Sequence, residues 1–160
     1  MRSVRFAKLV VSVAVPVLVG FFGSLFTTAD TLNTWYADLR KPVFTPPDWI
    51  FGPVWTTLFI LMGLAAFMVW QKGLGNRNVR IAIVCFVVQL VLNALWSVLF
   101  FGLRSPLAGL IDIILLLSAI NLTVVLFWQV SKTAALLLVP YMLWVTFASI
   151  LNLAIYILNR

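Results

Sequence analysis

Uncharged apolar stretches dominate this chain, and its polar positions gather in short segments between them. A membrane-spanning helix needs about 20 consecutive apolar residues, and five stretches of the 160-residue chain are long enough. Hydrocarbon offers no hydrogen-bonding partner to an open backbone, so each stretch must be helical. We therefore predict an all-α integral membrane bundle of five transmembrane helices, one domain over residues 1–160. The approximate spans are 6–27, 50–71, 81–103, 107–129 and 134–158.

The prolines and the short connections refine this bundle. Short links after the second, third and fourth spans predict that successive helices pack antiparallel. Pro106 suits the first turn of the fourth helix, where an N–H is not needed, and we expect Pro53 to do the same for the second. Pro16 and Pro140 lie inside spans and predict local bends. The first span is longer than the apolar core of a signal peptide, so we expect it to be retained.

Composition excludes several classes of protein. Hydrophobic residues make up 64% of the chain and charged residues 9%, whereas soluble domains are about 45–50% apolar and about 25% charged. The chain has no His and no Glu, and Cys85 is its one cysteine. A His-containing metal site, a Ser-His-Asp triad and a disulfide within the chain are excluded. We expect no metal site and no required cofactor.

The net charge of +7 is carried at the ends of the apolar runs, which fits the membrane interface better than a nucleic acid. Helix parity places one set of cations at the end that holds the N-terminus: Arg2, Arg5, Lys8, Lys72, Arg77, Arg80 and Lys132. The other end holds Arg40, Lys41, Arg104 and Arg160. This asymmetry predicts a cytoplasmic N-terminus, with the first loop and the C-terminus outside.

Residues 30–48 form a long connection in an otherwise tight molecule, and such loops are usually functional or disordered. Asp30 or Thr31 can cap a short helix here. Its apolar face would hold Leu32, Trp35, Tyr36 and Leu39, and Pro42, Pro46 and Pro47 stiffen the rest of the loop. We predict a partly ordered lid over one end of the bundle. The alternative is an aromatic belt at the membrane interface.

Three helix faces carry aromatic and amide side chains at helical spacing. They are Cys85, Gln89, Asn93, Trp96 and Phe100 in the third span, Tyr141, Trp144, Ala148 and Asn152 in the fifth, and Trp55, Phe59 and Met62 in the second. Amides are costly towards lipid, so these faces should point into the bundle. Together they predict an aromatic small-molecule pocket. The alternative is structural: amides tie helices together and tryptophans fill space.

Asp112 is the one acid inside a span, roughly 9 Å from the start of the fourth helix at 1.5 Å per residue. An intramembrane carboxyl indicates function by default. Its alternative is a protonated or hydrogen-bonded structural group near Arg104, and the sequence leaves both interpretations open.

Three segments resemble the TspO/MBR family, the tryptophan-rich sensory proteins related to the mitochondrial translocator protein, or peripheral benzodiazepine receptor. The stretch WYADLRKPVFTPPDWIFGPVW (35–55) resembles the family's first-loop signature. QLVLNALWSVLFFG (89–102) and PYMLWVTFASILN (140–152) resemble its third- and fifth-helix motifs. Two positions depart from the family: Phe44 stands where Trp is frequent, and Leu153 replaces the Tyr of the animal sterol-recognition pattern. We therefore do not expect sterol binding.

The resemblance implies a homodimer in the lipid bilayer that binds a tetrapyrrole such as protoporphyrin IX or haem. The ligand-binding residues we expect are Trp35, Tyr36, Pro47, Trp55, Asn93, Trp96, Tyr141, Trp144, Ala148 and Asn152. Arg40 and Lys41 could meet carboxylates at the pocket mouth. Because the chain has no His, the commonest haem ligand, we expect recognition by stacking and shape.

Three classes of function remain. The first is a tetrapyrrole-binding sensor or translocator-type protein. The second, which the resemblance also implies, is a light-dependent porphyrin-degrading enzyme with Trp55 and Trp144 as oxidisable aromatics, although the predicted pocket has no evident acid–base pair. The third is a small-solute or lipid transporter, which five spans disfavour because they cannot divide into two equal halves.

Overall fold

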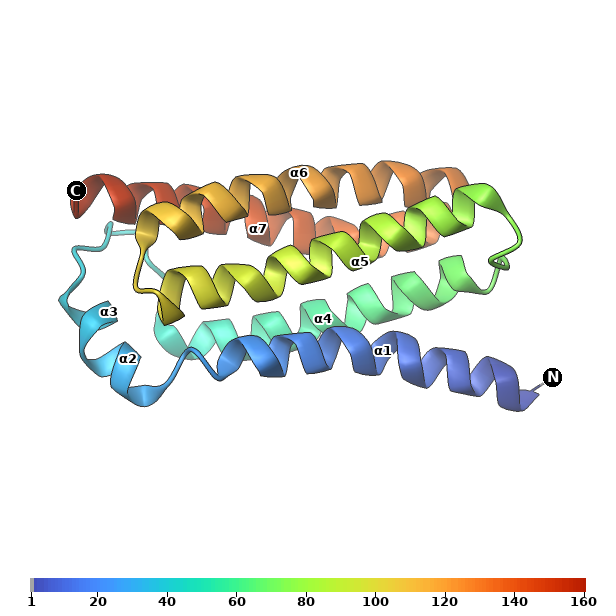
Figure 1. Cartoon of the computed structure of the whole chain (residues 1–160), viewed down its shortest axis with the longest axis horizontal. Coiled ribbons are helices and arrows are strands. Elements are labelled where there is room, and N and C mark those ends of the chain that lie inside the picture. Colours follow the sequence, from blue (N-terminus) through green and yellow to red (C-terminus); the bar gives the residue numbers. More distant parts are fainter. Residues whose placement is uncertain (1) are drawn as a thin grey trace.

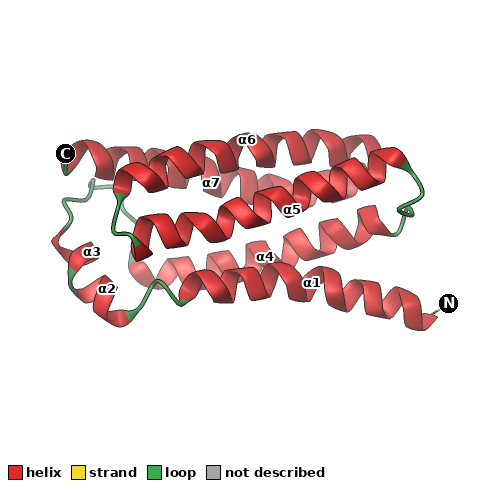
Figure 2. Cartoon of the chain, viewed as in Figure 1, coloured by secondary structure: helices red, strands yellow, loops and turns green. Residues whose placement is uncertain are grey.

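The computed structural model describes residues 2–160, apart from the side chains of Ala29 and Asp30. Every regular element in this range is helical (Figure 2). Five helices are long and apolar enough to cross a membrane. They are α1 (Arg2–Ser24), α4 (Asp48–Trp70), α5 (Arg77–Ser97), α6 (Pro106–Val130) and α7 (Lys132–Leu158). The predicted all-α membrane bundle is thus confirmed.

The long helices form a closed ring. Going around it, α1 contacts α4, α4 contacts α7, α7 contacts α6, α6 contacts α5, and α5 returns to α1. Neighbours joined by short links run antiparallel, as predicted (Figure 1). The N-terminus and the link between α4 and α5 lie at one end of the bundle, and the C-terminus and the first loop lie at the other (Figure 1). The two predicted sets of cations therefore belong to opposite ends.

The first loop folds over one end of the ring. It contains two short helices, α2 (Ala29–Asn33) and α3 (Trp35–Asp38), where the sequence predicted one. The cap of α2 is Thr28, whose Oγ1 accepts a hydrogen bond of 3.2 Å from the N–H of Thr31. Thr31 thus lies inside the helix that it was expected to cap, and the side chain of Asp30, the other expected cap, lies outside the described residues.

Two helix starts depend on proline and its neighbours. Pro106 is the first residue of α6, as predicted, and the Ser105 hydroxyl caps that helix by accepting from the N–H of Ala108 at 3.2 Å. The prediction for Pro53 was wrong: α4 begins at Asp48, so Pro53 lies in the second turn. A carboxylate in a first turn interacts favourably with the helix dipole, which explains the earlier start. Helices α1 and α7 run through their internal prolines, and the bends expected there stay predictions.

The third span ends in an irregular turn that the sequence did not predict. After α5, residues Val98–Gly102 form a π-helical turn, η1, in which the N–H of Leu103 bonds to the carbonyl of Val98 at 2.8 Å. Such turns add one residue to a helical turn and are frequently found at functional sites. As a result Trp96 meets two aromatic rings, stacking on Phe100 and contacting Phe101 edge-on.

Glycine sets the distance between α1 and α4. A Cβ at Gly63 would lie 2.6 Å from the Cα of Val13 and 2.7 Å from the carbonyl oxygen of Ser12. A Cβ at Gly20 would overlap the ring of Phe59. Small residues let membrane helices approach closely, since packing rather than water drives their association. The part of the α1–α4 interface around Gly20 and Gly63 is therefore closely packed.

We expect Gly63→Ala to destabilise the bundle by about 1–3 kcal/mol, because the added methyl group meets rigid backbone. The matched control is Gly52→Ala on the same helix, where a Cβ would meet nothing within 4 Å. Thermal unfolding of the detergent-solubilised protein, followed by circular dichroism, compares the two. Equal stability of both variants would contradict the close-packed seam.

Candidate ligand-binding cavity

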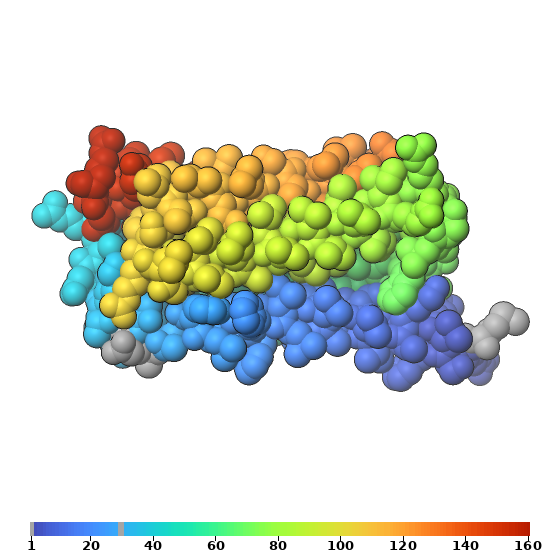
Figure 3. All heavy atoms as spheres, viewed as in Figure 1, coloured from blue at the N-terminus to red at the C-terminus, as the bar shows by residue number. Residues whose placement is uncertain are grey.

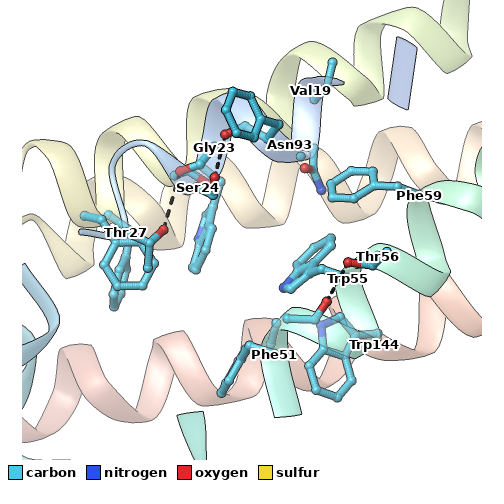
Figure 4. Close-up of a pocket in the computed structure, with 18 of the residues that line it drawn as sticks. Val19, Gly23, Ser24, Thr27, Phe51, Trp55, Thr56, Phe59, Asn93 and Trp144 are labelled. Carbon is cyan, nitrogen blue, oxygen red and sulfur yellow. Dashed lines mark hydrogen bonds between the residues drawn. The ribbon is translucent and has the colours of Figure 1, made fainter. Parts of the chain in front are cut away.

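A cavity of about 550 Å³ lies at the first-loop end of the bundle, walled by α1, α4, α5 with η1, and α7, beneath α2 and α3 (Figure 4). Small-molecule sites usually occupy about 300–1,000 Å³. No residue of α6 is part of the lining. The cavity therefore lies among the other four long helices.

Seven of the residues expected to bind ligand line this cavity: Tyr36, Trp55, Asn93, Trp96, Trp144, Ala148 and Asn152. Three others do not. Trp35 packs edge-on against Phe100, with ring centroids 5.6 Å apart. Pro47 precedes α4 just outside the lining, and Tyr141 is 1% exposed. The three predicted helix faces thus converge, as their periodicity required.

Tyr141 joins α7 to α5 through two buried amides. Its hydroxyl donates to Gln89 Oε1 at 2.8 Å and accepts from Asn93 Nδ2 at 3.1 Å. Its ring also contacts Trp55, with centroids 6.2 Å apart. These bonds match the structural alternative considered for the amides, because they tie helices together. Asn93 joins the two helices and also lines the cavity.

Trp96 is held in place by Asn152. Its Nε1 donates to Asn152 Oδ1 at 3.1 Å, and Asn152 Nδ2 donates to the carbonyl of Pro106 at 2.8 Å. The indole also stacks on Phe100 with centroids 5.1 Å apart and an angle of 18°. One wall of the cavity is therefore a fixed aromatic surface.

Trp144 presents the opposite case. Its Nε1 is buried and has no hydrogen-bond partner among the described residues. Leaving a buried donor unsatisfied costs about 1–3 kcal/mol. In Figure 4 the Trp144 ring lies at the cavity wall near Phe51 and Trp55, and the ring centroid of Phe51 is 5.8 Å away. Trp144 thus lines the cavity with its ring, whereas its buried N–H does not reach the cavity surface.

One wall of the cavity was not predicted from the sequence. Helix α1 lines the cavity with Gly20, Gly23 and Ser24, which recur at steps of three and one, and Thr27 follows just beyond the end of the helix. This spacing places them on one helix face, so a stripe of small residues was the available signal. Phe51, Phe100 and Phe101 also line the cavity and were not predicted as ligand contacts.

The structure places neither Arg40 nor Lys41 in the cavity lining. Instead, Lys41 Nζ lies 4.1 Å from the ring centroid of Tyr36, a cation–π contact. The carboxyl group in the lining belongs to Asp48. Burial raises the pKa of Tyr36 to about 12, and the charge of Asp48 adds to this effect. Tyr36 is therefore a neutral phenol at physiological pH.

Asp112 lies on α6, outside the cavity lining. It is 3% exposed, and its Oδ2 has no hydrogen-bond partner within the described part of the chain. The position excludes direct contact with a ligand held in this cavity. Both sequence-based interpretations of this carboxyl stay predictions.

The first loop covers the cavity as a lid. Tyr36 is buried, and its ring contacts those of Phe100 and Phe101 at 6.4 Å and 5.6 Å between centroids. The loop is also fastened to the end of α7 by two reciprocal bonds. The N–H of Arg40 donates to Asn159 Oδ1, and Asn159 Nδ2 donates to the carbonyl of Arg40, both at 2.9 Å. The lid interpretation therefore holds for Tyr36, whereas Trp49, 74% exposed, fits an interface belt.

Comparison with known proteins assigns the chain to a family. The sequence model of the TspO/MBR family matches residues 12–158. The chain belongs to the TspO/MBR family. It is 52% identical over 152 residues to the tryptophan-rich protein TspO of Archaeoglobus fulgidus, covering 95% of this chain and 97% of that protein. It is 39% identical over 142 residues to the human translocator protein, covering 88% of this chain and 83% of that protein.

A third TspO/MBR relative is the tryptophan-rich sensory protein of Cereibacter sphaeroides, 36% identical over 128 residues, covering 79% of this chain and 78% of that protein. The segments that first suggested the family now have places in the fold. The segment 35–55 supplies α3 and the start of α4, 89–102 supplies the end of α5 with η1, and 140–152 supplies part of α7. All three contribute to the cavity lining.

We expect Asn159→Ala to loosen the lid, because both bonds to the Arg40 backbone are lost. Two net hydrogen bonds contribute about 1–2 kcal/mol here, so amide exchange around Arg40 should quicken roughly 5- to 30-fold. Hydrogen–deuterium exchange with mass spectrometry measures this. Asn159→Asp is the matched control, since it keeps the acceptor for the Arg40 N–H and should quicken exchange less. Unchanged exchange in Asn159→Ala would show that these bonds do not hold the loop.

Proposed function

We propose that this membrane protein of the TspO/MBR family binds a tetrapyrrole, such as protoporphyrin IX or haem, in the cavity beneath the lid. The observation that carries the proposal is the convergence of three indoles, Trp55, Trp96 and Trp144, on one cavity of about 550 Å³. Broad flat walls of this kind suit a flat apolar ring system. Each aromatic pair contributes about 0.5–1.5 kcal/mol beyond the burial of its area.

The polar groups of the cavity support an orientation for such a ligand. Neither indole donor is free at the cavity surface, because the Nε1 of Trp144 is buried and the Nε1 of Trp96 is already bonded to Asn152. Carboxylate arms would be repelled by Asp48 in the lining. We propose that they reach past the lid towards Arg40 and Lys41, which lie outside the lining on the loop.

The proposal does not rely on iron ligation. The chain has no His, and the pKa of Tyr36, about 12, keeps that phenol protonated rather than a tyrosinate ligand. Metal-free protoporphyrin and haem are therefore expected to bind through the same stacking contacts.

Sensing or translocation is the use we propose for this binding, in line with relatives named translocator protein and tryptophan-rich sensory protein. One observation favours a second candidate, light-dependent porphyrin breakdown: Trp55 and Trp144, the two oxidisable aromatics proposed for it, both line the cavity. Illuminating the protein with protoporphyrin separates the two, because a decay rate equal to that of free dye excludes the enzyme. We also propose that the protein forms a homodimer and that its N-terminus lies in the cytoplasm.

We expect Trp55→Ala with Trp144→Ala to weaken protoporphyrin binding by about 1–3 kcal/mol, roughly 5- to 150-fold in Kd. Quenching of the remaining tryptophans by protoporphyrin gives the Kd. Trp128→Ala is the matched control, because Trp128 is 48% exposed on α6 and does not line the cavity. Equal affinity of the double variant and the wild type would defeat the proposal.

The orientation is tested with Gly75→Cys in a Cys85→Ala background, since Gly75 lies in the link between α4 and α5 at the N-terminal end. We expect a membrane-impermeant thiol reagent added outside intact cells to leave this cysteine unmodified. Val43→Cys, on the exposed first loop at the opposite end, is expected to react. The reverse pattern would invert the topology.

A further inference from the structure

The cavity lining divides sharply between exposed and covered residues. The exposed ones are Val17, Phe21 and Ser24 on α1, and Asp48, Gly52 and Thr56 on α4. Every other described lining residue is buried or half-buried. Within each helix the exposed residues follow steps of three or four, so they form one stripe along the helix. Because α1 and α4 are neighbours in the ring, the two stripes frame an opening between them.

The other boundaries of the cavity are closed. Between α1 and α5, a Cβ at Gly23 would lie 2.9 Å from the hydroxyl of Ser97, and Figure 3 shows α1 packed along α5 on that face. Between α4 and α7, Phe51 contacts Trp144. Above the cavity, the lid buries Tyr36 and is fastened at Asn159.

The opening itself ends where glycine closes the seam. Gly20 fits against Phe59, and Gly63 fits against the backbone of α1. Towards the first-loop end the helices leave space, since a Cβ at Gly52 would meet nothing within 4 Å. From Ser24 to Gly20 on α1 and from Asp48 to Thr56 on α4, the opening extends about 6–12 Å at 1.5 Å per residue. Half of a bilayer's hydrocarbon core measures about 15 Å, so the opening faces the acyl chains of one leaflet.

The rim of the opening has the chemistry of a lipid-facing surface. The Ser24 hydroxyl donates to the carbonyl of Phe21 at 2.6 Å, and the Thr56 hydroxyl donates to that of Gly52 at 2.9 Å (Figure 4). Hydroxyl groups bonded to their own helix present little unsatisfied polarity to hydrocarbon. Val17 and Phe21 add apolar surface, 38% and 63% exposed. Asp48 lies at the end of the stripe, in the first turn of α4.

We propose that ligands enter and leave this cavity sideways, from the surrounding lipid leaflet through the opening between α1 and α4, while the lid stays fastened. The class of ligand is an amphiphile that dissolves in the bilayer and keeps a polar edge towards the membrane surface. This inference rests on the proposed function only for the identity of the ligand, because the opening belongs to the cavity whatever it holds.

The test uses a thiol placed on the far wall. Ala148→Cys, in a Cys85→Ala background, puts the single cysteine of the full-length protein in the cavity lining on α7. In vesicles, a bilayer-soluble pyrene maleimide should modify it at least tenfold faster than a charged, water-soluble methanethiosulfonate reagent, after each rate is normalised to that reagent's rate with an exposed Val43→Cys. Adding Gly52→Phe should slow the pyrene reaction at least tenfold, because the ring fills the opening.

Control variants separate a blocked opening from general damage. Ile60→Phe adds the same ring to an exposed position of α4 that does not line the cavity, and should leave the rate within twofold. Thr56→Phe is a second plug and should repeat the effect of Gly52→Phe. Asn159→Ala loosens the lid and should also leave the rate within twofold.

Two results would overturn the proposal: a rate unchanged by both plugs, or a rate that rises at least fivefold in Asn159→Ala, which would make the lid the entrance. Parallel stopped-flow mixing with protoporphyrin-loaded vesicles extends the test to the proposed ligand. Slower association and slower dissociation of protoporphyrin in Gly52→Phe than in the wild type supports both proposals. If thiol labelling follows the opening but protoporphyrin does not bind the wild type, the proposed function fails and the lateral entrance stands.

Discussion

The structure depends on the absence of hydrogen-bonding partners in hydrocarbon. This constraint makes each span a helix, and it also decides what its polar side chains do. Ser24, Thr56 and Ser149 bond to their own helix backbone, whereas Gln89 and Asn93 are joined across helices by Tyr141. This satisfaction fails at the Nε2 of Gln89, at the indole N–H of Trp144 and at a carboxyl oxygen of Asp112, and each of these buried groups carries an unfavourable desolvation cost.

The second determinant of the cavity is the uneven spacing of α1 and α4. Gly63 lets the helices touch backbone to backbone, and Gly20 admits the ring of Phe59. Beyond Phe59, the α4 residues at the cavity are the aromatics Phe51 and Trp55, the small residues Gly52 and Thr56, and Asp48 in the first turn. The same pair of helices is thus sealed at one end of its seam and parted at the other, and the cavity occupies the parted end.

Much of this arrangement could be predicted from the sequence. The five spans follow from hydrophobic runs that hydrocarbon forces into helices, and the convergence of Trp55, Trp96 and Trp144 follows from helical spacing. The π-helical turn could not be predicted, because Val98–Gly102 has no residue that an α-helix excludes. The α1 wall was missed because glycine and serine signal close packing as readily as a binding surface. Arg40 and Lys41 were expected at the mouth because charge is visible in a sequence, whereas the contacts that hold the loop are not.

The wide turn at Val98–Gly102 has a geometric consequence for the rest of the chain. Each residue of an α-helix advances the chain by about 100° around its axis, so one additional residue shifts everything after it out of phase with the helix before it. That offset brings Phe101 against the ring of Trp96, on which Phe100 already stacks. It also sets the direction in which the chain continues to Ser105 and α6. A deletion of one residue here would restore a regular helix but misdirect the following corner, so the length of this segment is constrained even where its side chains can vary.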